Sequence, residues 1–126
     1  MTIRVFLVED NSLIRESVIE ALEELAPVQV VGFATTEDHA VEWLKQDRNG
    51  CDLVVVDIFL ERGSGLGVLG ACANLAPIDA VVLSNYVTAE MKRKCTDLGA
   101  RRVFDKSTEI EDLIEFCPRL DSGEAP

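Results

Sequence analysis

Reactive polar side chains follow short apolar runs at four places in this sequence. Asp57 comes directly after the apolar run Leu53–Val56. The others are Glu9 and Asp10 after residues 5–8, Ser84 after residues 81–83, and Lys106 shortly after the apolar pair 103–104. Three carboxylates, a hydroxyl and an amine suit the transfer of a phosphoryl group to a carboxylate with help from a divalent metal, because that transfer depends mainly on stabilising negative charge.

A cluster of Glu9, Asp10 and Asp57 would need a cation, because neighbouring carboxylates repel one another. Mg²⁺ takes oxygen ligands and keeps some of its water, so two carboxylates and a backbone carbonyl would form an open site. We expect Asp57 to attack phosphorus in line and to become an aspartyl phosphate. Lys106 would contact the phosphoryl oxygens, and Ser84 would donate a hydrogen bond to one of them.

Five short apolar segments alternate with five segments of helical periodicity. The predicted strands are residues 5–8, 28–34, 53–56, 81–83 and 102–105. The first predicted helix carries an apolar face of Ile14, Val18, Leu22 and Leu25. Thr35 or Thr36 is expected to cap the second helix, and the third covers residues 66–75. Thr88 is expected to cap the fourth helix, which Gly99 ends, and the fifth runs from near Thr108 to near Cys117, before Pro118. Strict alternation predicts an α/β fold, a parallel sheet with helices on both faces. The carboxyl ends of the strands then share one edge, where the polar groups would meet.

Size and composition predict one domain, residues 1–117, followed by a flexible polar tail, residues 118–126. The chain has 126 residues, of which 48% are hydrophobic, and this is enough for a core. Because no apolar stretch approaches the roughly 18 residues of a membrane-spanning helix, we expect a soluble cytoplasmic protein that contacts no membrane. The formal charge of −11 argues against direct binding of a nucleic acid backbone. The basic triplet Lys92–Lys94 is interpreted as a solvated helix face, with docking of an acidic partner as the alternative.

Four cysteines are widely spaced in the chain and form no Cys-x-x-Cys pair. This spacing argues against a zinc site or a thioredoxin-type redox site. Free thiols in a reducing compartment fit better, and Cys72 and Cys117 are expected to pack in the core.

The segment Gly65–Gly70 matches the pattern G-x-G-x-x-G of dinucleotide-binding folds. Such a site needs the glycines tight against the first strand, at the start of a helix. Here they begin eight residues after Asp57, and Ser84 rather than an acid ends the following strand. The pattern is therefore not interpreted as a nucleotide site.

Four segments carry a specific combination of residues, namely Val8–Asn11, Val56–Leu60 with Gly65, Leu83–Ser84, and Gly99–Ala100 through Asp105–Ser107. Because of these segments, residues 3–117 resemble the receiver domain of two-component response regulators, which has the chemotaxis-regulator-like fold. The resemblance implies a flavodoxin-like (βα)5 domain whose five-stranded, doubly wound parallel sheet has the order 2-1-3-4-5. It also implies phosphotransfer to Asp57 from a phosphohistidine on a sensor histidine kinase or a histidine phosphotransfer protein.

The resemblance assigns roles to individual residues. It makes Asp57 the phosphorylation site, Ser84 the switch hydroxyl and Lys106 the phosphate-binding lysine. The implied Mg²⁺ ligands are Glu9, Asp10, Asp57 and the main-chain carbonyl of Phe59. Such a domain is a signalling switch rather than an enzyme, and it catalyses only its own phosphotransfer and dephosphorylation.

Two further groups of residues are expected to act around the site. Phe59 and Tyr86 stand two residues beyond Asp57 and Ser84, where their rings would shield the aspartyl phosphate and slow its hydrolysis; simple cover of apolar surface is the alternative. The kinase is expected to dock on Leu13, Ile14, Arg15 and Ser107, with burial of Ile14 in the core as the alternative reading of that residue.

Three positions depart from the family pattern. Val103 stands where the family usually has an aromatic switch residue. The usual coupling between the hydroxyl of Ser84 and an aromatic ring therefore has no aromatic residue at this position. Ser107 replaces a proline that is common after the lysine, and we therefore expect no cis bond there. Glu61 replaces another common proline, which should loosen the loop around it.

We interpret the sequence as a phosphorelay receiver, without an output domain in this chain, that switches the binding of a downstream protein partner. A phosphorylation-dependent homodimer is left open. The alternative is a receiver-like interaction module that works without phosphorylation. The intact set of Asp10, Asp57, Ser84 and Lys106 argues against that alternative.

Overall fold

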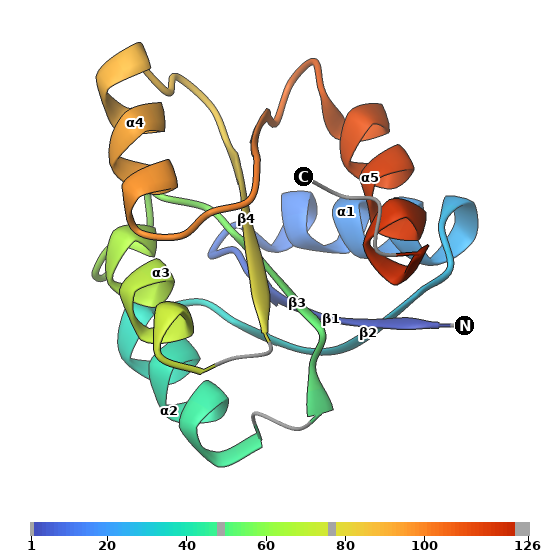
Figure 1. Cartoon of the computed structure of the whole chain (residues 1–126), viewed down its shortest axis with the longest axis horizontal. Helices are drawn as coiled ribbons and strands as arrows, with labels where there is room; N and C mark the ends of the chain where they lie inside the picture. Colours follow the sequence, from blue (N-terminus) through green and yellow to red (C-terminus); the bar gives the residue numbers. More distant parts are fainter. Residues whose placement is uncertain (1, 48–49, 76–77, 123–126) are drawn as a thin grey trace.

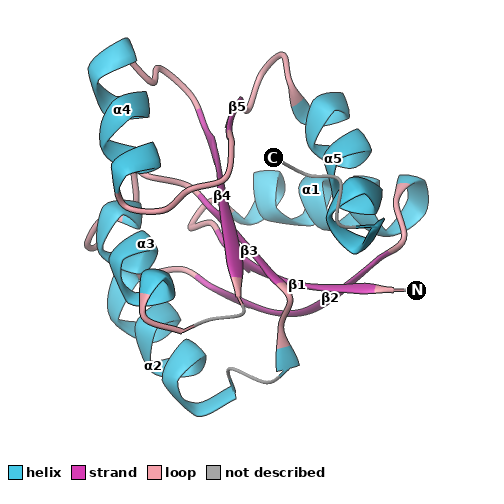
Figure 2. Ribbon diagram, viewed as in Figure 1, coloured by secondary structure: helices cyan, strands magenta, loops and turns pink. Residues whose placement is uncertain are grey.

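The predicted strands form one parallel sheet in the computed structural model of the protein (Figure 1, Figure 2). The structure describes residues 2–47, 50–75 and 78–122. The strands are β1 (Ile3–Val8), β2 (Val28–Ala34), β3 (Leu53–Val56), β4 (Asp79–Ser84) and β5 (Val103–Asp105). Their order in the sheet is β2-β1-β3-β4-β5, which confirms the predicted doubly wound topology and the edge position of residues 28–34.

Helices cover both faces of the sheet. Within the described part of the chain they are α1 (Ser12–Leu25), α2 (Glu37–Asp47), α3 (Gly65–Ala73), α4 (Ala89–Asp97) and α5 (Ile110–Ser122). Figure 1 shows α1 and α5 on one face and α2, α3 and α4 on the other. Right-handed crossovers produce this division, because the chain changes direction across the sheet after β2.

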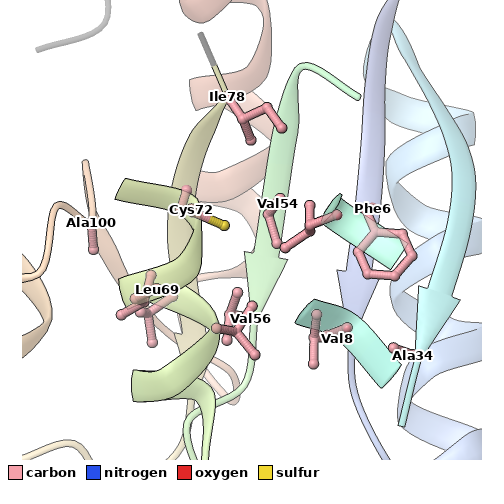
Figure 3. Packing of buried hydrophobic residues seen from close by; sticks show 14 of the residues in the cluster. Phe6, Val8, Ala34, Val54, Val56, Leu69, Cys72, Ile78 and Ala100 are labelled. Atoms are coloured by element: carbon pink, nitrogen blue, oxygen red, sulfur yellow. The ribbon is translucent and has the colours of Figure 1, made fainter. Parts of the chain in front are cut away.

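The central strand β3 is buried along its whole length, since helices cover both of its faces. Val54 and Val56 join the apolar cluster beneath α2, α3 and α4, together with residues of β1 (Figure 3). Leu53 and Val55 join the opposite cluster, which packs against α1 and α5. The apolar run thus needs no alternation with polar residues, and Asp57 is the first polar side chain after it.

Side-chain caps define where several helices begin. Thr88 caps α4 as predicted, because its Oγ1 accepts the Met91 N–H at 3.2 Å. Thr36 Oγ1 accepts the His39 N–H at 3.2 Å, in agreement with the cap expected before α2. At the other end of α4, Gly99 has φ of +104°, a left-handed conformation that glycine adopts at helix ends without a steric cost.

Two predictions about the helices are wrong. Leu25 does not extend the buried face of α1, because its side chain is 64% exposed and burial of that face ends at Leu22. Pro118 does not end α5 near Cys117, because the helix continues to Ser122 with the proline inside it.

Packing explains the longer α5. Phe116 and Cys117 are buried, and Leu120, one turn beyond, packs on the same cluster. Burial of these side chains outweighs the roughly 3 kcal/mol that an internal proline costs a helix. Residues 118–122 therefore do not belong to the expected tail, and residues 123–126 lie outside the described residues.

The buried thiols should make the fold sensitive to alkaline pH. Burial raises the pKa from the ordinary 9.0 to about 11 for Cys51, about 12 for Cys72 and about 11 for Cys117. Because the pKa of the thiol is raised in the folded state, burial of the neutral thiol contributes its full stability to the fold below pH 9.0. That contribution is lost as the pH rises toward 11, because only the unfolded chain ionises there.

Urea unfolding under reducing conditions measures the effect. At about pH 10 each of these thiols should lower the free energy of unfolding by about 1 kcal/mol relative to about pH 8. Cys72→Ala should therefore lose less stability over that interval than the wild type does. An equal loss in both proteins would contradict the assignment to the thiols.

Candidate functional site

The sheet brings the predicted polar groups to one edge. Glu9 and Asp10 follow β1, Asp57 follows β3, Ser84 ends β4 and Lys106 follows β5. Val8 pairs with Val56 across neighbouring strands, so the acids that follow these two residues lie side by side. The parallel register thus converts four separate sequence segments into one cluster at the carboxyl edge.

Asp57 is buried, with 6% of its surface exposed, and both of its carboxylate oxygens accept hydrogen bonds. Oδ1 accepts the Ser84 hydroxyl at 2.7 Å and the Phe59 backbone N–H at 3.2 Å. Oδ2 accepts the Lys106 ammonium at 2.8 Å. The hydroxyl and the amine predicted to contact a phosphoryl group therefore already contact the proposed acceptor.

Lys106 also forms an ion pair with Glu9, at 2.6 Å between Nζ and Oε1. Burial lowers the pKa of the Lys106 ammonium, but its hydrogen bonds to Asp57 and Glu9 outweigh that effect, and the pKa is raised overall. Burial raises the pKa of the Glu9 carboxyl, although the bonds from Lys106 and from the Asn11 N–H act against it. The amine is therefore a full positive charge at neutral pH.

Asp10 is half-buried and is held by the loop that follows β3. Its Oδ2 accepts the Glu61 backbone N–H at 2.5 Å. Proline has no N–H and could not make this bond. Glu61 therefore ties the loop to Asp10, the opposite of the loosening expected from the replacement of a proline.

The acidic cluster fits a divalent cation. Glu9, Asp10 and Asp57 each present a carboxylate oxygen, and these oxygens lie within 4.8 Å of one another. Within the described part of the chain, Lys106 is the only cation that forms an ion pair with these carboxylates, and it leaves two negative charges uncompensated. Carboxylate oxygens at this spacing are the hard ligands that Mg²⁺ prefers.

Asn11 has a supporting position that the sequence interpretation missed. Its Oδ1 accepts the Ile14 N–H at 3.0 Å and caps α1, while its own N–H donates to Glu9 Oε2 at 3.1 Å. Both Glu9 oxygens are thereby engaged, one by Asn11 and one by Lys106. The preference for asparagine directly before a helix could have indicated the cap, but not its bond to Glu9.

The two aromatic rings near the site are open to solvent. Tyr86 is 91% exposed and Phe59 is 52% exposed. Tyr86 also has φ of +58°, a conformation that non-glycine residues rarely adopt, in the loop after β4. Because both rings are this exposed, shielding of Asp57 would require them to become more buried.

Three of the four predicted docking residues share a groove beside the site. Leu13, Ile14 and Ser107 line it together with Lys106, and its volume is about 360 Å³. Arg15 lies elsewhere, because its guanidinium donates to the Glu9 carbonyl oxygen at 3.1 Å and stacks 4.2 Å from the centroid of the Phe33 ring. Ile14 is half-buried and packs on the core, in agreement with the alternative reading, while its part in docking stays a prediction.

The glycines of the segment Gly65–Gly70 serve local packing. A Cβ on Gly65 would lie 2.3 Å from the Asp57 carbonyl oxygen, so this position requires a close backbone approach. The first strand does not lead into these glycines, in agreement with the argument against a nucleotide site. The basic triplet Lys92–Lys94 is exposed on α4, as expected for a solvated face.

Comparison with known proteins gives a consistent family. The profile of the response regulator receiver domain matches residues 5–117. The chain is similar to the response regulator UvrY of Escherichia coli, with 25% identity over 97% of this chain and 56% of UvrY. It is also similar to the transcriptional regulatory protein PdtaR of Mycobacterium tuberculosis, with 33% identity over 88% of this chain and 53% of PdtaR. The chain thus spans about half the length of the curated relatives it matches.

Solved structures show the same fold. A two-component response regulator of the LuxR family from Aurantimonas superimposes with a TM-score of 0.87 and 20% identity, covering 99% of this chain and 89% of that one. The signal receiver domain of the response regulator NarL from Mycobacterium tuberculosis gives a TM-score of 0.83 and 24% identity, covering 99% and 98%. In the described part of the chain, no helix has the length and apolar character needed to cross a bilayer.

Proposed function

This chain belongs to the response regulator receiver domain family of two-component signalling, and on that premise we propose that Asp57 accepts a phosphoryl group in a Mg²⁺-dependent reaction. One observation carries the proposal. The buried Asp57 carboxylate lies between the Ser84 hydroxyl and the Lys106 ammonium, with two further acids beside it. This arrangement offers an acceptor, a hydrogen-bond donor and charge compensation at one point.

The residues divide the chemistry among them. An Asp57 oxygen attacks phosphorus as the P–N bond of a phosphohistidine breaks, and the leaving imidazole keeps the electron pair and takes up a proton. Lys106 exchanges its contact with the carboxylate for one with the phosphoryl oxygens, and Ser84 donates its hydroxyl hydrogen to another of them. Burial strengthens both interactions, because little water competes for them.

Glu9, Asp10, Asp57 and the main-chain carbonyl of Phe59 would hold the metal. When bound, Mg²⁺ neutralises charge on the phosphoryl oxygens and so removes the repulsion between donor and acceptor. Glu9 contributes mainly by holding Lys106, since both of its oxygens are already engaged. Asp10 Oδ2 accepts from the loop, whereas Oδ1 accepts no hydrogen bond from the described part of the chain, so Asp10 is the more open ligand.

The proposed donor is a sensor histidine kinase or a histidine phosphotransfer protein, docked at the groove of Leu13, Ile14 and Ser107. Lys106 lines this groove and also contacts Asp57, which supports docking beside the proposed acceptor. We propose output through a downstream protein partner at the surface of α4, β5 and α5. The formal charge of −11 disfavours direct binding of a nucleic acid by this domain.

Phosphoryl uptake tests the proposal. With acetyl phosphate and Mg²⁺, the wild type should gain one phosphoryl group by intact mass spectrometry, and chelation of the metal should prevent the gain. Asp10→Asn should lower the uptake by at least about tenfold. Loss of a residue that only supports a metal ligand commonly costs about that much, and loss of a ligand itself should cost no less. Asp112→Asn removes an exposed acid from α5 and should change nothing.

A wild type that gains no phosphoryl group from acetyl phosphate or from any histidine kinase would overturn the proposal. It would favour an interaction module that works without phosphorylation. Uptake that is unaffected by both chelation and Asp10→Asn would overturn the metal's role alone.

The two exposed rings give a separate prediction about lifetime. If Phe59 and Tyr86 close over the aspartyl phosphate, replacing both by alanine should shorten its half-life, because water then reaches phosphorus more easily. Decay of the phosphorylated mass after removal of the donor measures this half-life. Equal half-lives of the double variant and the wild type would assign the rings to simple surface cover.

A further inference from the structure

Glu37, the first residue of α2, holds the loop that follows the acceptor. Its Oε1 accepts the Ser64 backbone N–H at 2.8 Å. Its own backbone N–H donates to the Arg62 carbonyl oxygen at 3.2 Å. One residue of a distant helix therefore bonds the loop at two points, in a half-buried position.

Two glycines leave room for the Glu37 side chain. A Cβ on Gly67 would lie 2.0 Å from Glu37 Oε2, and the three atoms nearest to it all belong to Glu37. A Cβ on Gly63 would lie 2.5 Å from the Glu37 Cβ, and Gly63 has φ of +84°. A Cβ on Gly70 would meet no atom within 4 Å, so Gly70 takes no part. The middle glycine of the G-x-G-x-x-G pattern thus accommodates an internal carboxylate where a dinucleotide fold would place a phosphate.

The carboxylate is also favourably placed in electrostatic terms. Ser64 is the N-cap of α3, so Glu37 Oε1 accepts an N–H at the end of that helix where backbone donors lack partners. A negative charge is stabilised at this end by the helix dipole. The contact therefore resists the thermal opening that exposed loops commonly undergo.

The loop connects Glu37 to the acceptor site. Ser64, which Glu37 bonds, forms an isolated bridge with Phe59 on the opposite side of the loop. The Phe59 N–H donates to Asp57, and the Glu61 N–H donates to Asp10. Movement of the loop would therefore disturb two of the three acids and the Phe59 carbonyl proposed to hold the metal.

We propose that Glu37 is a positioning residue of the acceptor site, which fixes the loop of residues 58–64 so that the metal ligands keep their spacing. This inference rests on the proposed function, because it assigns Glu37 a part in Mg²⁺ binding. Glu37 touches neither the acceptor nor the metal ligands directly.

Exchange of the Ser64 amide hydrogen and calorimetric titration with Mg²⁺ test the role. Glu37→Ala should speed exchange at Ser64 by at least about tenfold, because the N–H loses a charged acceptor. It should weaken Mg²⁺ binding by about tenfold, as loss of outer-shell support commonly does. Glu37→Gln keeps an acceptor oxygen and should bind Mg²⁺ within about threefold of the wild type. Asp38→Ala removes an exposed acid from the same helical turn and should leave both readouts unchanged.

Gly67→Ala displaces the Glu37 carboxylate without removing it, and together with Glu37→Ala it forms a double-mutant cycle. Alone, Gly67→Ala must displace Glu37, so it should lower the Tm and weaken Mg²⁺ binding. In the Glu37→Ala background the same methyl group meets no carboxylate, and it should no longer lower the Tm. Should Glu37→Ala fail to fold, the comparison of Gly67→Ala with the wild type still measures the effect of displacing the side chain.

The outcomes separate the inference from the function on which it rests. The inference is overturned if Glu37→Ala matches Asp38→Ala in both exchange and Mg²⁺ affinity, or if the effects of Glu37→Ala and Gly67→Ala simply add. A wild type that binds no Mg²⁺ would overturn the proposed function itself, whatever the variants show.

Discussion

Asp57→Asn should abolish phosphoryl uptake while the protein stays folded. Asparagine keeps an oxygen that can accept from Ser84 and from the Phe59 N–H, so the local geometry has no reason to collapse. Lys106 keeps its ion pair with Glu9 at 2.6 Å, and one of three mutually repelling acids is gone. The neutral amide is a poor nucleophile, so uptake from acetyl phosphate should fall by at least about 100-fold.

Intact mass spectrometry after incubation with the donor measures this effect, and thermal unfolding monitors the fold. The stability change should stay below about 2 kcal/mol, because the remaining groups are still paired. Asp112→Asn again serves as the control, with normal uptake. A folded Asp57→Asn protein that gains a phosphoryl group as fast as the wild type would show that the acceptor is another residue.

Gly65→Ala should produce the largest loss of stability among the substitutions proposed for this protein. The new Cβ would lie 2.3 Å from the Asp57 carbonyl oxygen and 2.7 Å from both the Ile58 Cα and the Val56 Cγ1. Two of these three atoms are backbone, and the Gly65 N–H donates to the Ile58 carbonyl oxygen at 2.9 Å. Relief of the clash must therefore move α3 away from β3, at a cost of at least about 3 kcal/mol.

Urea unfolding measures the loss, with Gly70→Ala as the matched control. Gly70 lies in the same helix with open space around it, so alanine there should gain up to about 1 kcal/mol from helix propensity. Because the clash involves the backbone of Asp57, the Gly65→Ala protein should also lose phosphoryl uptake. Equal urea midpoints for the two alanine variants would contradict the close approach at Gly65.

The parts of the fold that follow from local patterns could be predicted from the sequence. Continuous apolar runs such as Leu53–Val56 indicate strands buried on both faces, and the alternation with helical segments predicts the parallel sheet. Once the sheet is parallel, the meeting of Asp57, Ser84 and Lys106 at its carboxyl edge follows from topology alone. The structure brings these side chains within hydrogen-bond distance, and their roles in phosphotransfer remain predictions.

The features that were missed depend on contacts between distant residues. The bond between Glu37 and Ser64 joins residues that are 27 positions apart, and no periodicity reveals it. The rule that proline ends a helix failed at Pro118, because burial of neighbouring side chains overrides local propensity. At Glu61 the important group is the backbone N–H, which donates to Asp10. These two residues are 51 positions apart, so the bond could not be predicted from the sequence.

Chemical trapping of the phosphorylated wild type identifies the acceptor residue directly. Borohydride reduces an aspartyl phosphate to homoserine, and tandem mass spectrometry of the resulting peptides locates the changed residue. We expect homoserine in place of Asp57 and unchanged Glu9 and Asp10. A reduced residue at any other acid, with an intact Asp57 in protein that carries the phosphoryl group, would contradict this expectation.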